Sequence, residues 1–104
     1  MSNPTSRVAY AKYYEVFDKA LAAEKGIRLA FPSQSAALAF QGRMHQARTI
    51  DRNDNKKVYE PGHKMHGCSA YDVVSVSRPR MDTEGEWWLY IEPNDRVDVH
   101  IEEL

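Results

Sequence analysis

The spacing of apolar residues along this chain changes from a helical period to a strand period and back. Over residues 5–25, apolar side chains recur every three or four positions, which predicts a helix with one apolar face. Gly26 follows at a position where a left-handed residue commonly ends a helix. Residues 27–31 then alternate between apolar and other side chains, which predicts a short strand. The apolar face of the first helix contains Tyr10, Tyr13, Phe17 and Leu21.

A second helix is predicted to begin after Pro32, with Ser33 as its N-cap, and to fray around residues 51–55. Residues 53–70 have no clear period and predict a long loop. The apolar face of the second helix contains Ala36, Ala37, Phe40, Met44 and Ala47.

Three further strands are predicted at residues 71–77, 86–92 and 96–102. The resulting order is α-β-α-β-β-β in a single domain that spans residues 1–104. We expect an α+β fold with a four-stranded mixed sheet, in which a helical crossover makes the first two strands parallel. The second helix should cover one face of the sheet, and the first helix should also pack on the sheet.

The charges of this chain are distributed unevenly, although the net charge is −1. Residues 1–80 contain thirteen of the fourteen Lys and Arg residues and seven of the fifteen acidic residues, for a net charge of +6. Residues 81–104 contain Arg96 and eight acidic residues, for a net charge of −7. Such asymmetry indicates a charged macromolecular partner.

Other features of the composition predict a cytoplasmic protein that has no membrane segment. Cys68 is the single cysteine, so no disulfide can form within the chain, which fits a reducing compartment. No stretch approaches the roughly 20 apolar residues of a membrane span. The N-terminal residues have no apolar run after a basic region, so we expect no signal peptide. The oligomeric state does not follow from the sequence.

The first candidate binding surface is one edge of the second helix. Gln41, His45, Arg48 and Arg52 are spaced four, three and four residues apart, so they line the same edge. Arginine side chains in such a row can pair with phosphates or carboxylates. Lys56 and Lys57 extend the row, and Arg43 adds to the basic charge of this helix. The alternative interpretation is a solvated helix surface with no binding role.

The second candidate surface is the outer face of the sheet. In the strand at 86–92, Trp88 and Tyr90 should point away from the second helix. An exposed face with Trp and Tyr can bind partners by stacking. The alternative is a second core layer in which the first helix covers these rings. Neighbouring strands should add Tyr71, Val73 and His100 to this face, and its rim should contain Glu86, Glu92, Asp98 and Glu102.

The third candidate is the loop that contains His63, His66 and Cys68, whose side chains are zinc ligands in other proteins. Their spacing matches no known zinc-finger pattern, and a fourth ligand would have to come from His45 or an acidic residue, so we expect no metal. Cys68 could act as a nucleophile with either histidine as its base. No third catalytic member or oxyanion element accompanies it, so we expect neither enzymatic activity nor a cofactor.

The stretch from Phe31 to Arg48 resembles helices of small phage-encoded accessory proteins. The residues that carry this resemblance are Phe31-Pro-Ser33, Ala36, Phe40-Gln-Gly-Arg43-Met44 and Ala47-Arg48, which cover under a quarter of the chain. The resemblance implies a short non-enzymatic protein that binds a host or phage machine.

Together these features predict a small binding protein, an inhibitor or adaptor, that docks on a protein partner in a nucleic-acid-handling machine. The alternative is direct binding of nucleic acid by the basic edge of the second helix. The residues expected to contact a partner are Gln41, Arg43, His45, Arg48, Arg52, Lys56, Lys57, Trp88, Tyr90, Asp98 and Glu102.

Overall fold

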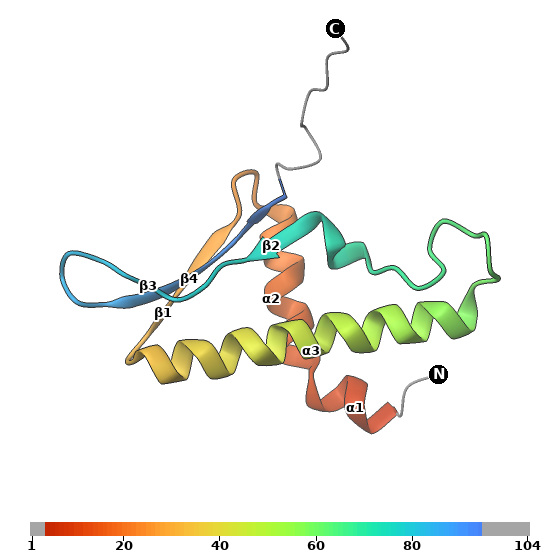
Figure 1. Ribbon diagram of the computed structural model, residues 1–104, viewed down its shortest axis with the longest axis horizontal. Coiled ribbons are helices and arrows are strands. Elements are labelled where there is room, and N and C mark those ends of the chain that lie inside the picture. The colour runs from red at the N-terminus through yellow and green to blue at the C-terminus, as the bar shows by residue number, and fades with distance from the viewer. Residues whose placement is uncertain (1–3, 95–104) are drawn as a thin grey trace, which may run out of the picture.

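A helical layer lies against one face of a small antiparallel sheet (Figure 1). The computed structural model describes the backbone of residues 4–94 and the side chains of residues 7–94. The predicted α+β class is confirmed. In chain order the elements are α1 (Pro4–Ala9), α2 (Ala11–Ala22), β1 (Ile27–Phe31), α3 (Gln34–Val58), the 3-10 helix η1 (Ala70–Val73), β2 (Val74–Val76), β3 (Arg80–Met81) and β4 (Trp87–Pro93).

The sheet has the strand order β1-β4-β2, and β3 also pairs with β4. Every pairing in the described part of the chain is antiparallel, so the expectation of a mixed sheet is wrong in this respect. β1 and β2 do run in the same direction, but β4 lies between them. β4 takes the central position because its apolar side chains need burial. The long connection through α3 allows β1 and β2 to lie apart, with β4 between them.

The core lies between the inner face of β4 and the two longer helices. Leu89 and Ile91 of β4 are fully buried, as the predicted alternation requires, whereas Trp87 on the same face is half-buried. Phe17 from α2 and Met44 from α3 are also fully buried. Both helices therefore pack on the same face of the sheet. The predicted strand at 96–102, with Val97, Val99 and Ile101, lies outside the described residues.

The predicted first helix is divided into α1 and α2 at Tyr10, whose backbone leaves the helical region with φ −103° and ψ 10°. Its buried face is also rotated from the predicted one. Leu21 is 40% exposed, because α2 turns a different edge toward α3 and the sheet. The buried residues of α2 are Tyr13, Tyr14, Phe17 and Ala20.

The second predicted helix begins as expected but ends later. The Ser33 hydroxyl accepts a hydrogen bond from the Ala36 N–H at 3.1 Å, which confirms the N-cap. α3 then continues through residues 51–55 to Val58. Polar residues in this stretch bond to other parts of the chain, and these tertiary contacts extend the helix beyond its local preference.

Residues 70–73 form η1 and not the first half of a strand. The Ser69 hydroxyl accepts the Tyr71 N–H at 3.1 Å, while Asp72 Oδ2 accepts the Ser69 N–H at 2.9 Å. This reciprocal arrangement is a capping box. It starts a helical turn, so the strand is limited to Val74–Val76.

Candidate binding surfaces

One edge of α3 holds residues 68–77 along most of their length, and we call this contact line the α3 seam. Its position follows from the spacing of polar residues on α3, because side chains three, four or seven residues apart share an edge. The hydrogen bonds of the seam join Gln41 Nε2 to Ser77 O (3.0 Å), Arg52 Nε and Nη2 to Asp72 Oδ1 (2.9 and 2.6 Å), and Asn55 Nδ2 to Cys68 O (2.6 Å).

At one end of the seam, a β-bulge presents the Ser77 carbonyl to α3. Three residues, 77–79, lie opposite two residues of β4 between the pairs Val76↔Ile91 and Arg80↔Trp88. The Ser77 N–H donates to the Tyr90 carbonyl at 2.8 Å, while the Tyr90 N–H donates to the Ser77 hydroxyl at 2.9 Å. The Ser77 carbonyl is thereby released from the ladder and accepts from Gln41.

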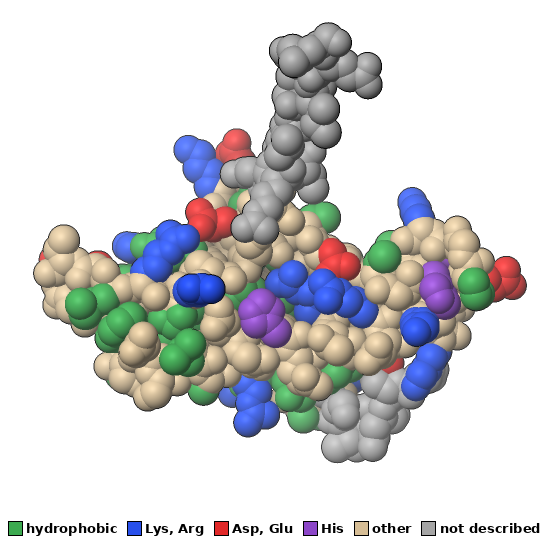
Figure 2. All heavy atoms as spheres, in the orientation of Figure 1, with side chains coloured by type: hydrophobic (Ala, Val, Ile, Leu, Met, Phe, Trp, Pro, Cys, Tyr) green, Lys and Arg blue, Asp and Glu red, His purple; other side chains and the backbone are tan. Residues whose placement is uncertain are grey.

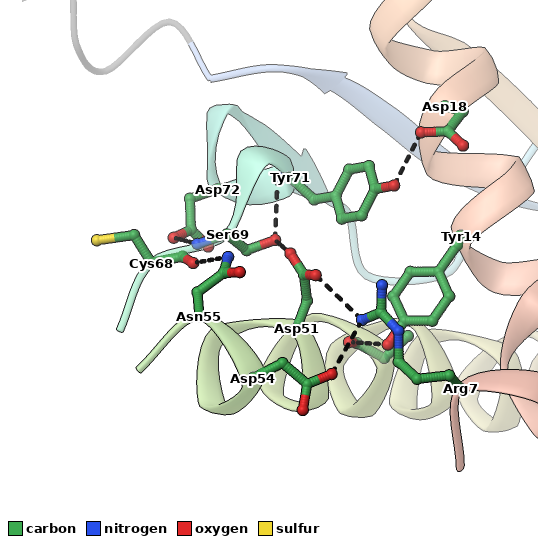
Figure 3. Close-up of polar contacts among 11 residues, drawn as sticks. Arg7, Tyr14, Asp18, Asp51, Asp54, Asn55, Cys68, Ser69, Tyr71 and Asp72 are labelled. Carbon is green, nitrogen blue, oxygen red and sulfur yellow. Dashed lines mark hydrogen bonds and ion pairs between the residues drawn. The ribbon is translucent and has the colours of Figure 1, made fainter. Parts of the chain in front are cut away.

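At the other end, Asp51 of α3 connects the seam to the N-terminal helix (Figure 3). The Ser69 hydroxyl donates to Asp51 Oδ2, and Arg7 Nη1 donates to Asp51 Oδ1 at 3.0 Å. Arg7 also lies 3.6 Å from Asp54. Three segments that are distant in the sequence therefore meet at the Asp51 carboxylate.

The ionisation of two residues reflects this packing. Burial raises the pKa of Tyr71 to about 12, helped by the hydrogen bond that its hydroxyl donates to Asp18 at 2.8 Å. Burial also acts to raise the pKa of Asp72, but the hydrogen bonds from Arg52 and Ser69 and the charge of Arg52 lower that pKa overall.

Two residues in the middle of this helix edge do not take part in the seam. His45 and Arg48 lie on the turns between Gln41 and Arg52, and with Arg52 they form what we call the cationic cluster. Figure 2 shows a histidine and adjoining Lys or Arg side chains over the middle of α3, with an acidic side chain beside them. Desolvation and the positive charge of Arg52 lower the pKa of Arg48. Desolvation and both arginines lower the pKa of His45.

The remaining basic residues of the predicted partner-binding set on this helix are Arg43, Lys56 and Lys57. Arg43 is exposed on another side of α3, where its Nη1 lies 3.5 Å from the Tyr10 hydroxyl. Lys56 and Lys57 are exposed in the last turn of the helix. The structure therefore brings together Gln41, His45, Arg48 and Arg52 as predicted, and separates Arg43 from them.

The outer face of the sheet has two arginines lying over two aromatic rings, and we call these four residues the arginine–aromatic face. Arg28 Cζ lies 3.8 Å from the Trp88 ring centroid, and Arg80 Cζ lies 4.7 Å from the Tyr90 ring centroid. Cross-strand pairing positions them, because Arg28 is opposite Tyr90 and Arg80 is opposite Trp88.

This face is not a second core layer. α2 packs with α3 on the opposite face, beside Val74 and Ile91, so the first helix does not cover Trp88 and Tyr90 (Figure 1). Tyr71 is not on the outer face either, because its ring stacks on buried Phe17 at 4.8 Å.

The structure also shows the exposure of some of the other residues predicted on this face and its rim. Val73 is 57% exposed. Of the acidic rim, Glu86 and Glu92 are exposed, and Glu92 pairs across the sheet with Ser75. The predicted members His100, Asp98 and Glu102 lie outside the described residues.

The loop at residues 59–69 does not assemble its candidate ligands. His63 Nδ1 accepts the Met65 N–H at 3.0 Å, and His66 Nδ1 lies 2.8 Å from the Tyr59 carbonyl oxygen. The Cys68 thiol points to the His66 carbonyl oxygen at 3.7 Å. Within residues 7–94, no three His, Cys, Asp or Glu side chains are grouped closely enough to hold a metal ion.

Sequence reasoning missed both arginines of the arginine–aromatic face and the capping box. Arg28 is the charged residue inside the predicted strand at 27–31, so its outward direction was available from the alternation. The Ser69-x-x-Asp72 spacing is the usual signal of a capping box. No sequence pattern indicated that β4 would bring Arg28 beside Trp88.

Comparison with protein-family models, curated proteins and solved structures gives no match to this chain. Among the helices in the described range 4–94, none is long and apolar enough to cross a membrane.

Proposed function

We propose that this chain is a non-enzymatic binding protein, an inhibitor or adaptor, that docks on a protein partner through its arginine–aromatic face. The observation that carries the proposal is the placement of Arg28 over Trp88 and of Arg80 over Tyr90. Trp, Tyr and Arg are the residue types most enriched among residues that dominate the binding energy of protein interfaces.

The charges of this face favour a partner surface that presents carboxylates. Neither Arg28 nor Arg80 forms an ion pair with a carboxylate in the part of the chain from 7 to 94. The adjacent acid, Asp82, uses Oδ2 to accept the Trp88 Nε1–H at 2.9 Å and Oδ1 to accept two backbone N–H groups. Both guanidinium groups therefore retain donors for aspartate or glutamate side chains of a partner.

The alternative function is direct binding of nucleic acid by the basic edge of α3. Gln41 and Arg52 already hold residues 68–77, which leaves fewer groups on this edge for phosphate contacts. The protein-docking proposal is therefore preferred. The placement of the partner in a nucleic-acid-handling machine stays a prediction of the sequence.

Affinity capture from an extract of the producing cells tests this proposal. The bait proteins are the wild type, Arg28→Glu with Arg80→Glu, and a control with Lys25→Glu and Lys64→Glu. The control makes the same change in formal charge at two exposed residues outside this face. Nuclease treatment of a parallel sample removes partners that are held through nucleic acid.

We expect a protein that the wild type and the lysine control retain after nuclease treatment. The arginine variant should retain it at least about tenfold more weakly, which corresponds to a loss of about 1.4 kcal/mol in binding free energy. Equal retention by both variants would contradict docking through this face. Retention that nuclease abolishes would favour the nucleic-acid alternative, for which affinity should fall with a salt slope of about 0.9 per phosphate contact on duplex DNA.

A further inference from the structure

The cationic cluster contains more positive charge than its surroundings neutralise. His45, Arg48 and Arg52 occupy successive turns of one α3 edge. Among the described residues, Asp72 is the carboxylate that acts on Arg48 and Arg52. One carboxylate therefore faces two guanidinium groups.

The hydrogen bonds of Asp72 come from donors other than Arg48. Its Oδ1 accepts both Nε and Nη2 of Arg52, at 2.9 and 2.6 Å, and its Oδ2 accepts the Ser69 N–H at 2.9 Å. The Asp72 carboxylate thus holds η1 in place, and neither Nε nor Nη2 of Arg48 donates to it.

Arg48 has two buried donors with no acceptor. Its Nε and Nη2 are shielded from solvent and form no hydrogen bond. These two nitrogens share one edge of the planar guanidinium group, and this edge can bind two oxygens of a carboxylate or phosphate. The guanidinium carbon lies over the Phe17 ring, 5.2 Å from the ring centroid. A desolvated charge without an acceptor is an unfavourable arrangement that an incoming anion relieves.

We propose that the cationic cluster is a binding site for a single oxyanion group, a phosphate or a carboxylate, held by the Nε and Nη2 donors of Arg48 with His45 and Arg52 beside it. The site is reachable, since Arg48 is half-buried and His45 is exposed. Binding requires rotation of the long Arg48 side chain, which brings its two shielded donors to the exposed side of this helix edge. This site lies on α3 and is separate from the arginine–aromatic face, so it stands independently of the proposed function.

Titration with inorganic phosphate and, separately, with acetate tests this site at constant ionic strength maintained with chloride. The arginine Nε–H signals and the His45 ring signals are followed by NMR. The matched variants are Arg48→Met, which keeps an unbranched apolar stem, and Arg43→Met, which removes an exposed arginine from another side of α3. Arg48→Lys provides a second variant that keeps the charge but loses the paired donors.

We expect a saturable shift of the Arg48 Nε–H signal and a higher pKa for His45 in the bound protein, because an anion offsets the charges of Arg48 and Arg52. Binding should weaken at least about tenfold in Arg48→Met and Arg48→Lys and remain unchanged in Arg43→Met. A response to phosphate but not acetate identifies a phosphate site, and the reverse identifies a carboxylate site. Shifts that do not saturate with either anion, or that persist in both Arg48 variants, would overturn the proposal.

Discussion

At the scale of single residues, contacts between distant parts of the chain set the ionisation of key side chains. Tyr71 stacks on Phe17 and donates to Asp18, so both its ring and its hydroxyl are held by α2. Arg48 of α3 lies beside the same Phe17 ring, but its Nε and Nη2 donors have no acceptor. Tyr71 stabilises the junction of η1 with the helices. Arg48 leaves two hydrogen-bond donors at this junction unsatisfied.

Tyr71 should ionise at a higher pH than a tyrosine in solution. Its pKa of about 12 in the folded protein exceeds the usual tyrosine value of about 10. The neutral hydroxyl therefore contributes stability that is fully present below pH 10 and is lost as the pH rises toward about 12. Ultraviolet titration of tyrosinate should show a late transition that disappears in Tyr71→Phe and moves to lower pH in Asp18→Asn. A transition of unchanged midpoint in Asp18→Asn would contradict this account.

At the scale of elements, each helix end and strand end is fixed by a different kind of signal. Ser33 and Ser69 cap α3 and η1 through local hydrogen bonds. The C-terminal half of α3 depends instead on long-range contacts of Asp51, Arg52 and Asn55. Gly26 allows β1 to begin close to β4, with φ +85°.

The two glycines Gly26 and Gly42 should respond to alanine with opposite signs. Gly42 lies within α3 and a Cβ there would meet no atom within 4 Å, so Gly42→Ala should stabilise the protein by about 0.5–1 kcal/mol. At Gly26 an added Cβ would meet the Ile91 carbonyl oxygen and the Glu92 Cα, and the positive φ is unfavourable for alanine. Gly26→Ala should therefore destabilise by more than about 1 kcal/mol. Urea unfolding measures both changes, and the same sign for both would contradict the structure.

Ser69→Ala should weaken the attachment of η1 to α3. The substitution removes the acceptor of the Tyr71 N–H and the donor to Asp51, at a residue that is buried. Loss of such a cap typically costs about 0.5–2 kcal/mol. Ser75→Ala, at an exposed position of β2, is the matched control and should change stability little. Comparable unfolding midpoints for the two variants would show that this capping box does not stabilise the fold.

At the scale of the whole molecule, the sheet separates two charged surfaces. α2 and α3 cover its inner face, and the cationic cluster lies on the edge of α3 beside residues 68–77. The arginine–aromatic face lies on the outer side of the same sheet. The two surfaces share no hydrogen-bond partner in the described range, so each should act without the other.

This separation predicts additive effects on stability. Arg48→Met removes two buried donors that have no acceptor and should stabilise the free protein, because leaving buried donors unsatisfied is costly. Arg28→Glu with Arg80→Glu loses two cation–π contacts and should destabilise by roughly 1–2 kcal/mol. The triple variant should match the summed changes within about 0.5 kcal/mol in urea unfolding. A larger discrepancy would indicate that the sheet couples the two surfaces.

The sequence by itself determined several of the elements and the apolar face of β4. The Ser33 cap, the alternation around Leu89 and the shared edge of Gln41, His45, Arg48 and Arg52 were all readable, because each depends on residues close in the chain. The sequence also contained the capping box at Ser69, although we expected a strand there.

Only the tertiary structure decided the strand order and the partners of the polar side chains. It placed β4 between β1 and β2, brought Arg28 and Arg80 over the rings of β4, and extended α3 through contacts with residues 68–72. It also engaged Arg52 with Asp72 while leaving two Arg48 donors unpaired, although both arginines belong to the same helix edge. The physical reason is that strand order and ion pairing depend on groups that folding brings together from distant positions, and no local pattern encodes that distance.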